Sequence, residues 1–245
     1  MIKKYFKSFD EKEIPYLFFE SSRNDFNNNI VILHGMVEHV NRYEEFGHFL
    51  SVNGYNVYII EIRGHGELRD NLFGDFGKRG IKEVFYDIEI FFNELSSKNG
   101  ISRENTVIFG HSMGGHGALM IALRNPQRYA SVSAFSPIVA PSQVPWGQKA
   151  FSAYLGDDQS TWANYDSLAL MKQSAHSKKL PLLIDQGSGD EFLAEQLKPE
   201  LFAQAAKDAN YPMTLRMQDG YDHSYYFISS FIADHFAHHA AALQA

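Results

Sequence analysis

Hydrophobic residues along the chain fall into short runs that alternate with longer amphipathic stretches. Several short runs are apolar at nearly every position, which is typical of strands buried on both faces of a sheet. The runs at residues 30–33 and 56–62 are of this kind, and further strand-like runs lie at residues 3–9, 14–19, 106–109, 131–135, 180–185 and 213–217. Stretches with helical spacing lie at residues 42–52, 81–95, 118–124, 195–209 and 225–243. Strands that alternate with helices predict an α/β fold, with a mostly parallel central sheet covered by helices on both faces.

One of these strands leads into a chemically informative turn. Residues 110–114 read Gly-His-Ser-Met-Gly, a Gly-x-Ser-x-Gly pattern between a strand and a helix. This is the sequence form of a nucleophile elbow, whose tight turn exposes the serine hydroxyl at the carboxyl edge of the sheet. Gly110 and Gly114 are then needed to avoid clashes. The pattern indicates a serine hydrolase with Ser112 as nucleophile, and an ordinary serine in a glycine-rich turn is the alternative.

A serine nucleophile needs a histidine that takes its proton and a carboxylate that orients the histidine. After an elbow of this kind the order along the chain is Ser, Asp or Glu, then His. His111 adjoins the serine and is expected to point away, and His116 lies on the following helix. His223 lies between the last strand and the last helix, so it is the predicted base.

The acid is expected on the loop after the penultimate strand, which offers Asp185, Asp190 and Glu191. Asp185 ends the strand and Glu191 begins the next helix. Asp190 follows two glycines that let the loop curl back, so it is the predicted acid. Asp222 is the alternative, but a residue adjacent to His223 rarely aims its side chain at it, and we expect Asp222 to brace the loop.

The oxyanion of the reaction needs two backbone N–H donors. One is the N–H of Met113, the residue after the nucleophile. The other is expected after the strand at residues 30–33, where a sharp turn at His34-Gly35 presents the N–H of Met36. His34, Gly35 and the methionine side chains are then candidates for the wall of the substrate pocket, although the methionines could equally fill the core.

Residues 137–165 interrupt the alternation of strands and helices. They hold three prolines and both tryptophans of the chain, with no clear period. We interpret them as a small cap-like excursion over the site and expect the indole of Trp146 to shorten the acyl pocket. No linker rich in proline, glycine and serine divides the chain, so residues 1–245 are expected to form one domain.

Composition narrows the choice of partners. A net charge of -7 and a pI near 5.9 argue against nucleic acid and anionic membranes. There is no cysteine, no apolar run long enough to span a membrane and no signal-like N-terminus, so we expect a cytoplasmic protein. The partner is expected to be a small-molecule ester, with no cofactor, and a homodimer is compatible with the sequence. The group His235, His238 and His239 suggests a solvated helix face rather than a metal site.

Two families resemble different parts of the chain. Residues 33–39, 42–43 and 62–66 resemble bacterial monoacylglycerol lipases and lysophospholipases. Residues 111–115, 123–126, 131–137, 145–147 and 220–227 resemble S-formylglutathione hydrolases of the esterase D family. Both belong to the α/β-hydrolase superfamily, so the resemblance implies that fold and ester hydrolysis through an acyl-enzyme. In the esterase D family the acid is the second aspartate of a segment like 185–190, which agrees with Asp190.

The boundary between the two resemblances coincides with a change in composition. There is no alanine from residue 1 to residue 111 and there are 21 from residue 112 to residue 245. We therefore interpret the chain as a chimera of the two families with a seam near residues 107–115, and local drift in composition is the alternative. The lipase family's apolar lid and the glutathione family's cysteine-containing loop are both missing from the sequence. The chimera is thus expected to prefer short-chain acyl esters, with monoacylglycerol lipase or S-formylglutathione thioesterase activity as alternatives.

Overall fold

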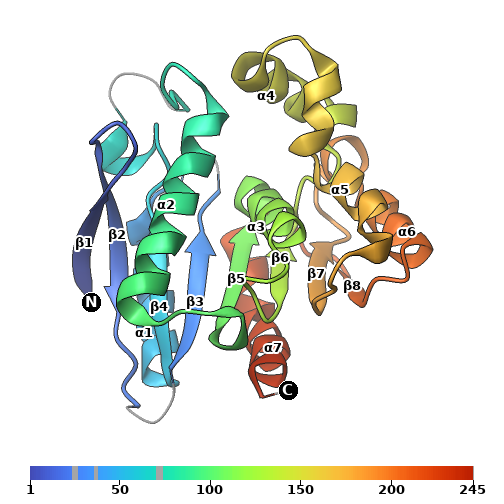
Figure 1. Cartoon of the computed structure of the whole chain (residues 1–245). Coiled ribbons are helices and arrows are strands. Elements are labelled where there is room, and N and C mark those ends of the chain that lie inside the picture. Colours follow the sequence, from blue (N-terminus) through green and yellow to red (C-terminus); the bar gives the residue numbers. More distant parts are fainter. Residues whose placement is uncertain (24–26, 36–37, 70–73, 245) are drawn as a thin grey trace.

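The computed structural model describes residues 1–23, 27–35, 38–69 and 74–244, and this part of the chain contains one sheet of eight strands (Figure 1). The order across the sheet is β1-β2-β4-β3-β5-β6-β7-β8. The β1–β2 and β2–β4 pairs are antiparallel, and all later pairs are parallel. The strands are β1 Ile2–Lys7, β2 Glu13–Phe19, β3 Asn28–Leu33, β4 Tyr55–Ile60, β5 Thr106–His111, β6 Val132–Phe135, β7 Leu182–Gly187 and β8 Met213–Gln218. The predicted α/β class is confirmed.

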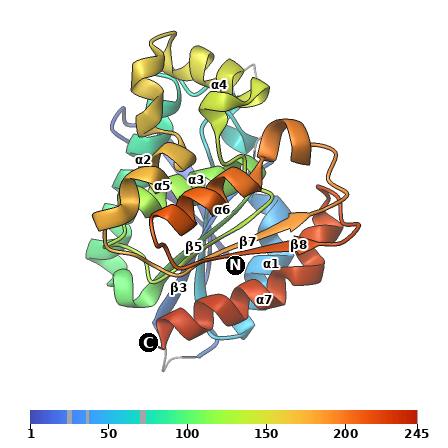
Figure 2. The same cartoon turned by 90° about the vertical axis from the view of Figure 1, so that its right-hand side faces the viewer.

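Helices cover both faces of this sheet, as Figure 2 shows most clearly. One face packs on α1 and α7, and the other packs on α2, α3, α5 and α6. The helices are α1 Glu44–Val52, α2 Ile81–Asn99, α3 Ser112–Arg124, α4 Pro145–Leu155, α5 Ser167–Gln173, α6 Pro199–Asp208 and α7 Tyr225–Leu243. Both layers follow from strands that are apolar on both sides and must be buried on both sides.

The two halves of the sequence form the two halves of the sheet. Strands before the predicted seam are β1, β2, β4 and β3, and β5 joins them to β6, β7 and β8. The helices cross this boundary, because the ring of Phe236 on α7 packs against Phe46 of α1 and Tyr55 of β4, with centroids 5.7 and 5.9 Å apart. The apolar core is thus continuous across the position of the seam.

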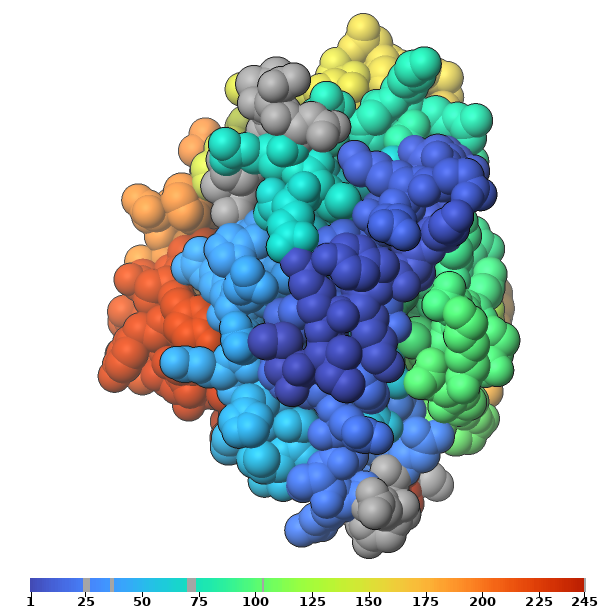
Figure 3. Space-filling view, turned by 90° about the vertical axis from the view of Figure 1, so that its left-hand side faces the viewer, coloured from blue at the N-terminus to red at the C-terminus, as the bar shows by residue number. Residues whose placement is uncertain are grey.

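Strand β1 closes one edge of the sheet, and its dark blue residues lie in the middle of the face shown in Figure 3. Three of its six residues are Lys3, Lys4 and Lys7. Lysines on an edge strand discourage pairing with another chain, because a second strand would bring their charges close together. β1 and β2 pair in antiparallel order, so the described part of the chain begins with a β-hairpin.

The segment at residues 137–165 contains more helix than its sequence indicates. It includes α4, which begins at Pro145, and the short α5 follows it. Proline at the first helical position is favourable there, since its missing N–H would have no partner in the helix. The helix predicted at residues 195–209 is likewise divided, because Lys198 has a φ of 49° and separates a π-helical turn from α6.

The histidines of α7 correct another prediction. His235 and His239 are buried, so this is not a solvated face. The ring nitrogens of His239 lie 2.7 and 2.8 Å from the hydroxyl oxygens of Ser131 and Ser133, and the ring of His235 stacks on Phe135 at 3.8 Å. The polar face of the helix meets polar residues of the sheet, which the pattern of α7 alone does not reveal. Among the residues that the structure describes, no group of three histidine, aspartate or glutamate side chains is placed to hold a metal ion.

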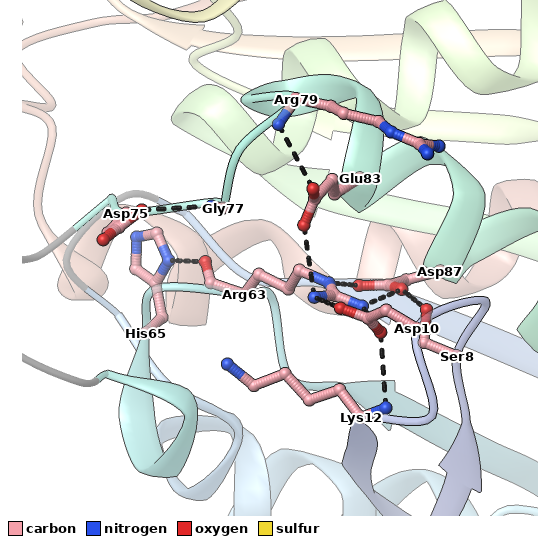
Figure 4. Close-up of polar contacts among 10 residues, drawn as sticks. All are labelled: Ser8, Asp10, Lys12, Arg63, His65, Asp75, Gly77, Arg79, Glu83 and Asp87. Carbon is pink, nitrogen blue, oxygen red and sulfur yellow. Dashed lines mark hydrogen bonds and ion pairs between the residues drawn. The ribbon is translucent and has the colours of Figure 1, made fainter.

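A buried arginine fastens the loop after β4 to its surroundings (Figure 4). The guanidinium of Arg63 donates two hydrogen bonds to Asp10, at 2.7 and 2.8 Å, and also binds Glu83 and Asp87. Burial by itself would lower the pKa of Arg63, but these carboxylates raise it, and the pKa of Asp10 falls to about 2. The backbone carbonyl of Arg63 lies 2.9 Å from Nδ1 of His65. The network therefore ties the β1–β2 turn, α2 and His65 together.

We predict that the whole chain unfolds in one cooperative transition, because both halves contribute adjacent strands to one sheet and share one core. Differential scanning calorimetry checks this, with the ratio of calorimetric to van't Hoff enthalpy expected near one. Two well-separated transitions would mean that the parts before and after the seam fold as separate domains.

Candidate active site

Ser112 stands in a strained turn between β5 and α3. Its φ is 52°, in the left-handed region that a non-glycine residue rarely adopts, at a cost of about 1–3 kcal/mol. A Cβ atom on Gly110 would lie 2.2 Å from the carbonyl oxygen of Gly114, and one on Gly114 would lie 2.3 Å from that of Leu33. Both positions thus require glycine, as predicted, and the serine is held at the carboxyl edge of the sheet.

Asp190 and His223 are brought together by the loops after β7 and β8. Nδ1 of His223 lies 2.7 Å from Oδ2 of Asp190. The same carboxylate accepts hydrogen bonds from the Ser136 hydroxyl and the Gln186 amide, both at 3.1 Å, and from the Phe192 backbone N–H at 2.9 Å. The two loops also meet through the backbone, because the N–H of Gly189 donates to the carbonyl of Tyr221 at 2.9 Å. The Asp190 side chain is consequently fixed and points at the imidazole.

The surroundings of Asp190 keep it charged. Burial by itself raises the pKa of this carboxyl, but the hydrogen bond from His223 and those from Phe192 and Gln186 outweigh burial and hold the pKa below its usual range. Asp222 is exposed, and its carboxylate accepts the N–H of Ser224 at 3.0 Å. That contact fits the expectation that Asp222 braces the loop.

His223 also lies beside the elbow. The centroid of its ring is 4.8 Å from that of His111, the residue before Ser112, and the planes are tilted by 43°. The sequence predicts that His111 points away from the site, and this prediction is wrong, because its ring lies beside that of His223. The residue is buried at the end of β5.

Of the two predicted oxyanion donors, one belongs to the described part of the chain. Met113 follows Ser112 in the first turn of α3, where backbone N–H groups have no partner within the helix. Met36 lies outside the described residues. The turn before it, at His34 and Gly35, lies close to the elbow. The carbonyls of Leu33 and His34 approach Gly114 so closely that a Cβ there would collide with them.

An apolar cavity of about 100 Å³ opens between this turn, α3, α2 and α4. His34, Gly35 and Met113 line it, which places three of the predicted pocket residues in one wall. Its other walls are almost entirely apolar and include Phe76, Ile88, Met120, Phe151, Tyr154 and Tyr165.

Trp146 lies elsewhere. It is not among the described residues that line the cavity, and its ring packs on Phe192 with centroids 4.6 Å apart. Phe192 in turn meets the ring of His223 edge-on at 5.3 Å. Trp146 is 46 % exposed and reaches the site through Phe192, on the side of His223.

Sequence reasoning missed several residues that surround the site. His65 lines the cavity, and its position in Arg-Gly-His-Gly directly after a strand could have suggested this. The cavity walls on α2 carry no such signal, because Val84 and Ile88 read as ordinary apolar positions of an amphipathic helix.

Comparison with known proteins agrees with this geometry. A family model described as "Putative esterase" matches residues 89–238, more than half of the chain. The chain belongs to this esterase family. It is also similar to an S-formylglutathione hydrolase from Agrobacterium tumefaciens, with 33% identity over 98% of this chain and 94% of that one, and a TM-score of 0.84.

More distant structures share the fold. A ferulic acid esterase has 19% identity over 99% of this chain and 97% of its own, with a TM-score of 0.76. The fluorophosphonate-binding serine hydrolase F of Staphylococcus aureus has 16% identity over 96% of both chains, with a TM-score of 0.74.

The protein is thus a serine esterase with the α/β-hydrolase fold, as predicted from its sequence. The family match begins before the predicted seam, and the Agrobacterium tumefaciens structure covers both sides of it. No helix among the described residues is long and apolar enough to cross a membrane.

We predict that Asp190→Asn lowers kcat by about 10³–10⁴-fold, the loss seen when an amide replaces the acid of another triad, because an amide no longer stabilises the imidazolium. Asp222→Asn is the matched control, since it makes the same chemical change on the same loop as His223, and it should lose less than about tenfold. Steady-state kinetics on one p-nitrophenyl ester measures both. A larger loss for Asp222→Asn would assign the acid to Asp222.

Proposed function

We propose that the protein is a carboxylesterase that hydrolyses short-chain acyl esters through an acyl-enzyme on Ser112. The observation that carries the proposal is the 2.7 Å contact between Asp190 and His223, with the His223 ring beside the strained elbow. In this proposal Ser112 is the nucleophile, His223 the base and Asp190 the acid.

The reaction follows from these roles. Nε2 of His223 takes the hydroxyl proton while Oγ of Ser112 attacks the ester carbonyl, and Asp190 stabilises the imidazolium. The N–H of Met113 and, as the second donor, that of Met36 bind the developing oxyanion. The imidazolium then gives its proton to the leaving alcohol, and water hydrolyses the acyl-enzyme by the same route.

The direction of proton transfer indicates on which side of the site the alcohol part and the acyl part of the ester lie. Because His223 must protonate the leaving group, the alcohol part of the ester lies on the histidine side, against Phe192 and Trp146. The acyl part then lies on the opposite side, in the cavity lined by Gly35 and Met113. This assignment moves Trp146 from the acyl pocket, where the sequence suggested it, to the alcohol side.

The size of the cavity supports a preference for short acyl groups. An apolar cavity of about 150 Å³ holds a benzene ring, so the 100 Å³ found here has room for about four carbon atoms. Each buried methylene contributes about 0.8 kcal/mol only while it meets an apolar wall. The gain is therefore expected to end near butyryl, in a cavity that Phe151 and Tyr154 help to line.

S-formylglutathione thioesterase activity is the second candidate, and the similarity to the Agrobacterium tumefaciens S-formylglutathione hydrolase favours it. Monoacylglycerol lipase activity is a third candidate, drawn from the resemblance of residues 33–39 and 62–66. We retain the chimera of two families as a proposal supported by the absence of alanine before Ser112. A homodimer, and a small-molecule ester as the partner, also remain proposals.

We predict that Ser112→Ala abolishes ester turnover and leaves the fold unchanged, because only a hydroxyl is lost. Hydrolysis of p-nitrophenyl butyrate and circular dichroism measure the two properties. Residual activity above about one part in a thousand, with an unchanged spectrum, would contradict Ser112 as the nucleophile.

We predict that kcat/KM for p-nitrophenyl esters is highest between acetate and butyrate and falls at octanoate and palmitate. Tyr154→Ala should extend the optimum towards longer chains by enlarging the cavity that Tyr154 lines. Trp146→Ala should leave the order of chain lengths unchanged, because the indole lies on the alcohol side.

Three outcomes of this series would contradict the proposal. A maximum of kcat/KM at octanoate or beyond favours monoacylglycerol lipase activity. A shift of the optimum to longer acyl chains in Trp146→Ala would mean that the indole lies in the acyl pocket. S-formylglutathione assayed alongside should be cleaved poorly, and a rate far above every ester favours the thioesterase.

A further inference from the structure

A second buried carboxylate lies behind the turn at Gly35. Glu38 is 8 % exposed, and its Oε2 accepts hydrogen bonds from the backbone N–H of Gly35 and the hydroxyl of Tyr43, both at 2.7 Å. Its other oxygen, Oε1, lies 3.6 Å from Nδ1 of His111 and 3.7 Å from Nε of Arg42. One oxygen is therefore used by the turn, and the other faces the histidine that precedes Ser112.

His111 connects this carboxylate with the base. Its buried ring lies between Glu38 and His223, and the centroids of the two imidazoles are 4.8 Å apart. Neither ring nitrogen of His111 has a hydrogen-bond partner among the described residues. A buried polar ring that makes no hydrogen bond within normal distance is unusual and calls for an explanation other than stability.

The charges of this group are well defined. Burial by itself raises the pKa of Glu38, but His111, the Tyr43 hydroxyl and the Gly35 N–H outweigh it and hold the pKa at about 2. The pKa of His111 is lowered, chiefly by burial. At neutral pH a charged carboxylate is thus separated from His223 by one neutral, buried ring.

We propose that Glu38 is a positioning residue for the base: its carboxylate acts across His111 to stabilise the imidazolium that His223 becomes when it takes the proton of Ser112. The proposal rests on the proposed function and adds a second negative charge to that of Asp190. Glu38 holds the His34–Gly35 turn with one oxygen, so the oxyanion loop and the base depend on the same side chain.

Other charged groups face His223 from neighbouring elements. Asp190 contacts Nδ1 directly, and Asp222 on the same loop is exposed and screened by water. Tyr225, at the start of α7, has a raised pKa because of burial and is neutral at working pH. Arg42 is the cation closest to Glu38 in this group and opposes its effect, but its side chain is 49 % exposed. Of the two charges, the buried negative charge of Glu38 therefore acts on His223 more strongly than the half-exposed positive charge of Arg42.

The test is the pH profile of kcat/KM for p-nitrophenyl acetate in Glu38→Gln. The amide keeps an oxygen for Gly35 and Tyr43 but loses the charge, so the imidazolium of His223 loses that stabilisation. We expect the acid limb to move to lower pH by about half a unit or more, the size of an interaction between partly buried charges one side chain apart. The plateau should fall by about threefold or more, as the imidazolium in the transition state loses the same stabilisation.

Two further variants separate charge from structure. Glu44→Gln makes the same change on an exposed residue nearby and should leave the acid limb in place, because water screens its charge. Arg42→Gln removes a half-exposed positive charge that lies 3.7 Å from Glu38, so it should move the limb to higher pH, by less than Glu38→Gln moves it to lower pH. An acid limb that stays in place in both Glu38→Gln and Arg42→Gln would overturn the proposal, and would leave Glu38 a clamp for the turn. If Glu38→Gln does not fold, Arg42→Gln decides alone.

A measurement that needs no turnover distinguishes this proposal from the proposed function. In Ser112→Ala, the pKa of His223 is read from the titration of its imidazole by nuclear magnetic resonance, with and without Glu38→Gln. A lower pKa in the double variant supports the action of Glu38 even if esterase activity is assigned elsewhere. An unchanged pKa contradicts it even if Ser112 proves to be the nucleophile.

Discussion

The site depends on the close approach of two backbone segments, the end of β3 and the start of α3. The carbonyl of Leu33 lies where a Cβ on Gly114 would be, so the strand and the helix can meet only because that position is glycine. This contact sets the strained conformation of Ser112 and places the His34–Gly35 turn beside it. Nucleophile and oxyanion loop are therefore positioned by one packing constraint, and the sheet on both sides of β5 supports it.

The site also contains two buried, negatively charged carboxylates. Asp190 and Glu38 are both removed from water, which by itself raises the pKa of a carboxyl, yet both keep low pKa values. Each is stabilised by a backbone N–H and by a hydroxyl, from Ser136 or Tyr43, and each faces a histidine. Donors fixed by the fold replace water and cost no reorganisation during the reaction.

The two sides of the site differ in how they are built. The cavity between α2, α3 and α4 is almost wholly apolar, whereas Trp146 and Phe192 form a partly exposed wall beside His223. The Arg63 network fastens His65 and α2, which both line this cavity. In the proposed function the apolar cavity receives the acyl group, and the partly exposed wall of Trp146 and Phe192 faces the alcohol.

The sequence by itself determined the α/β class, the position of Ser112, and Asp190 and His223 as candidates. Local rules sufficed, because strand periodicity, a glycine-bounded turn and the order of residues along the chain are properties of short segments. Tertiary structure decided what depends on contacts between distant segments: the contact of His111 with His223, the buried histidines of α7, the walls of the cavity and the place of Trp146. A buried histidine and an exposed one have the same local sequence signal, and only the packing of α7 on β6 or of Glu38 on His111 distinguishes them.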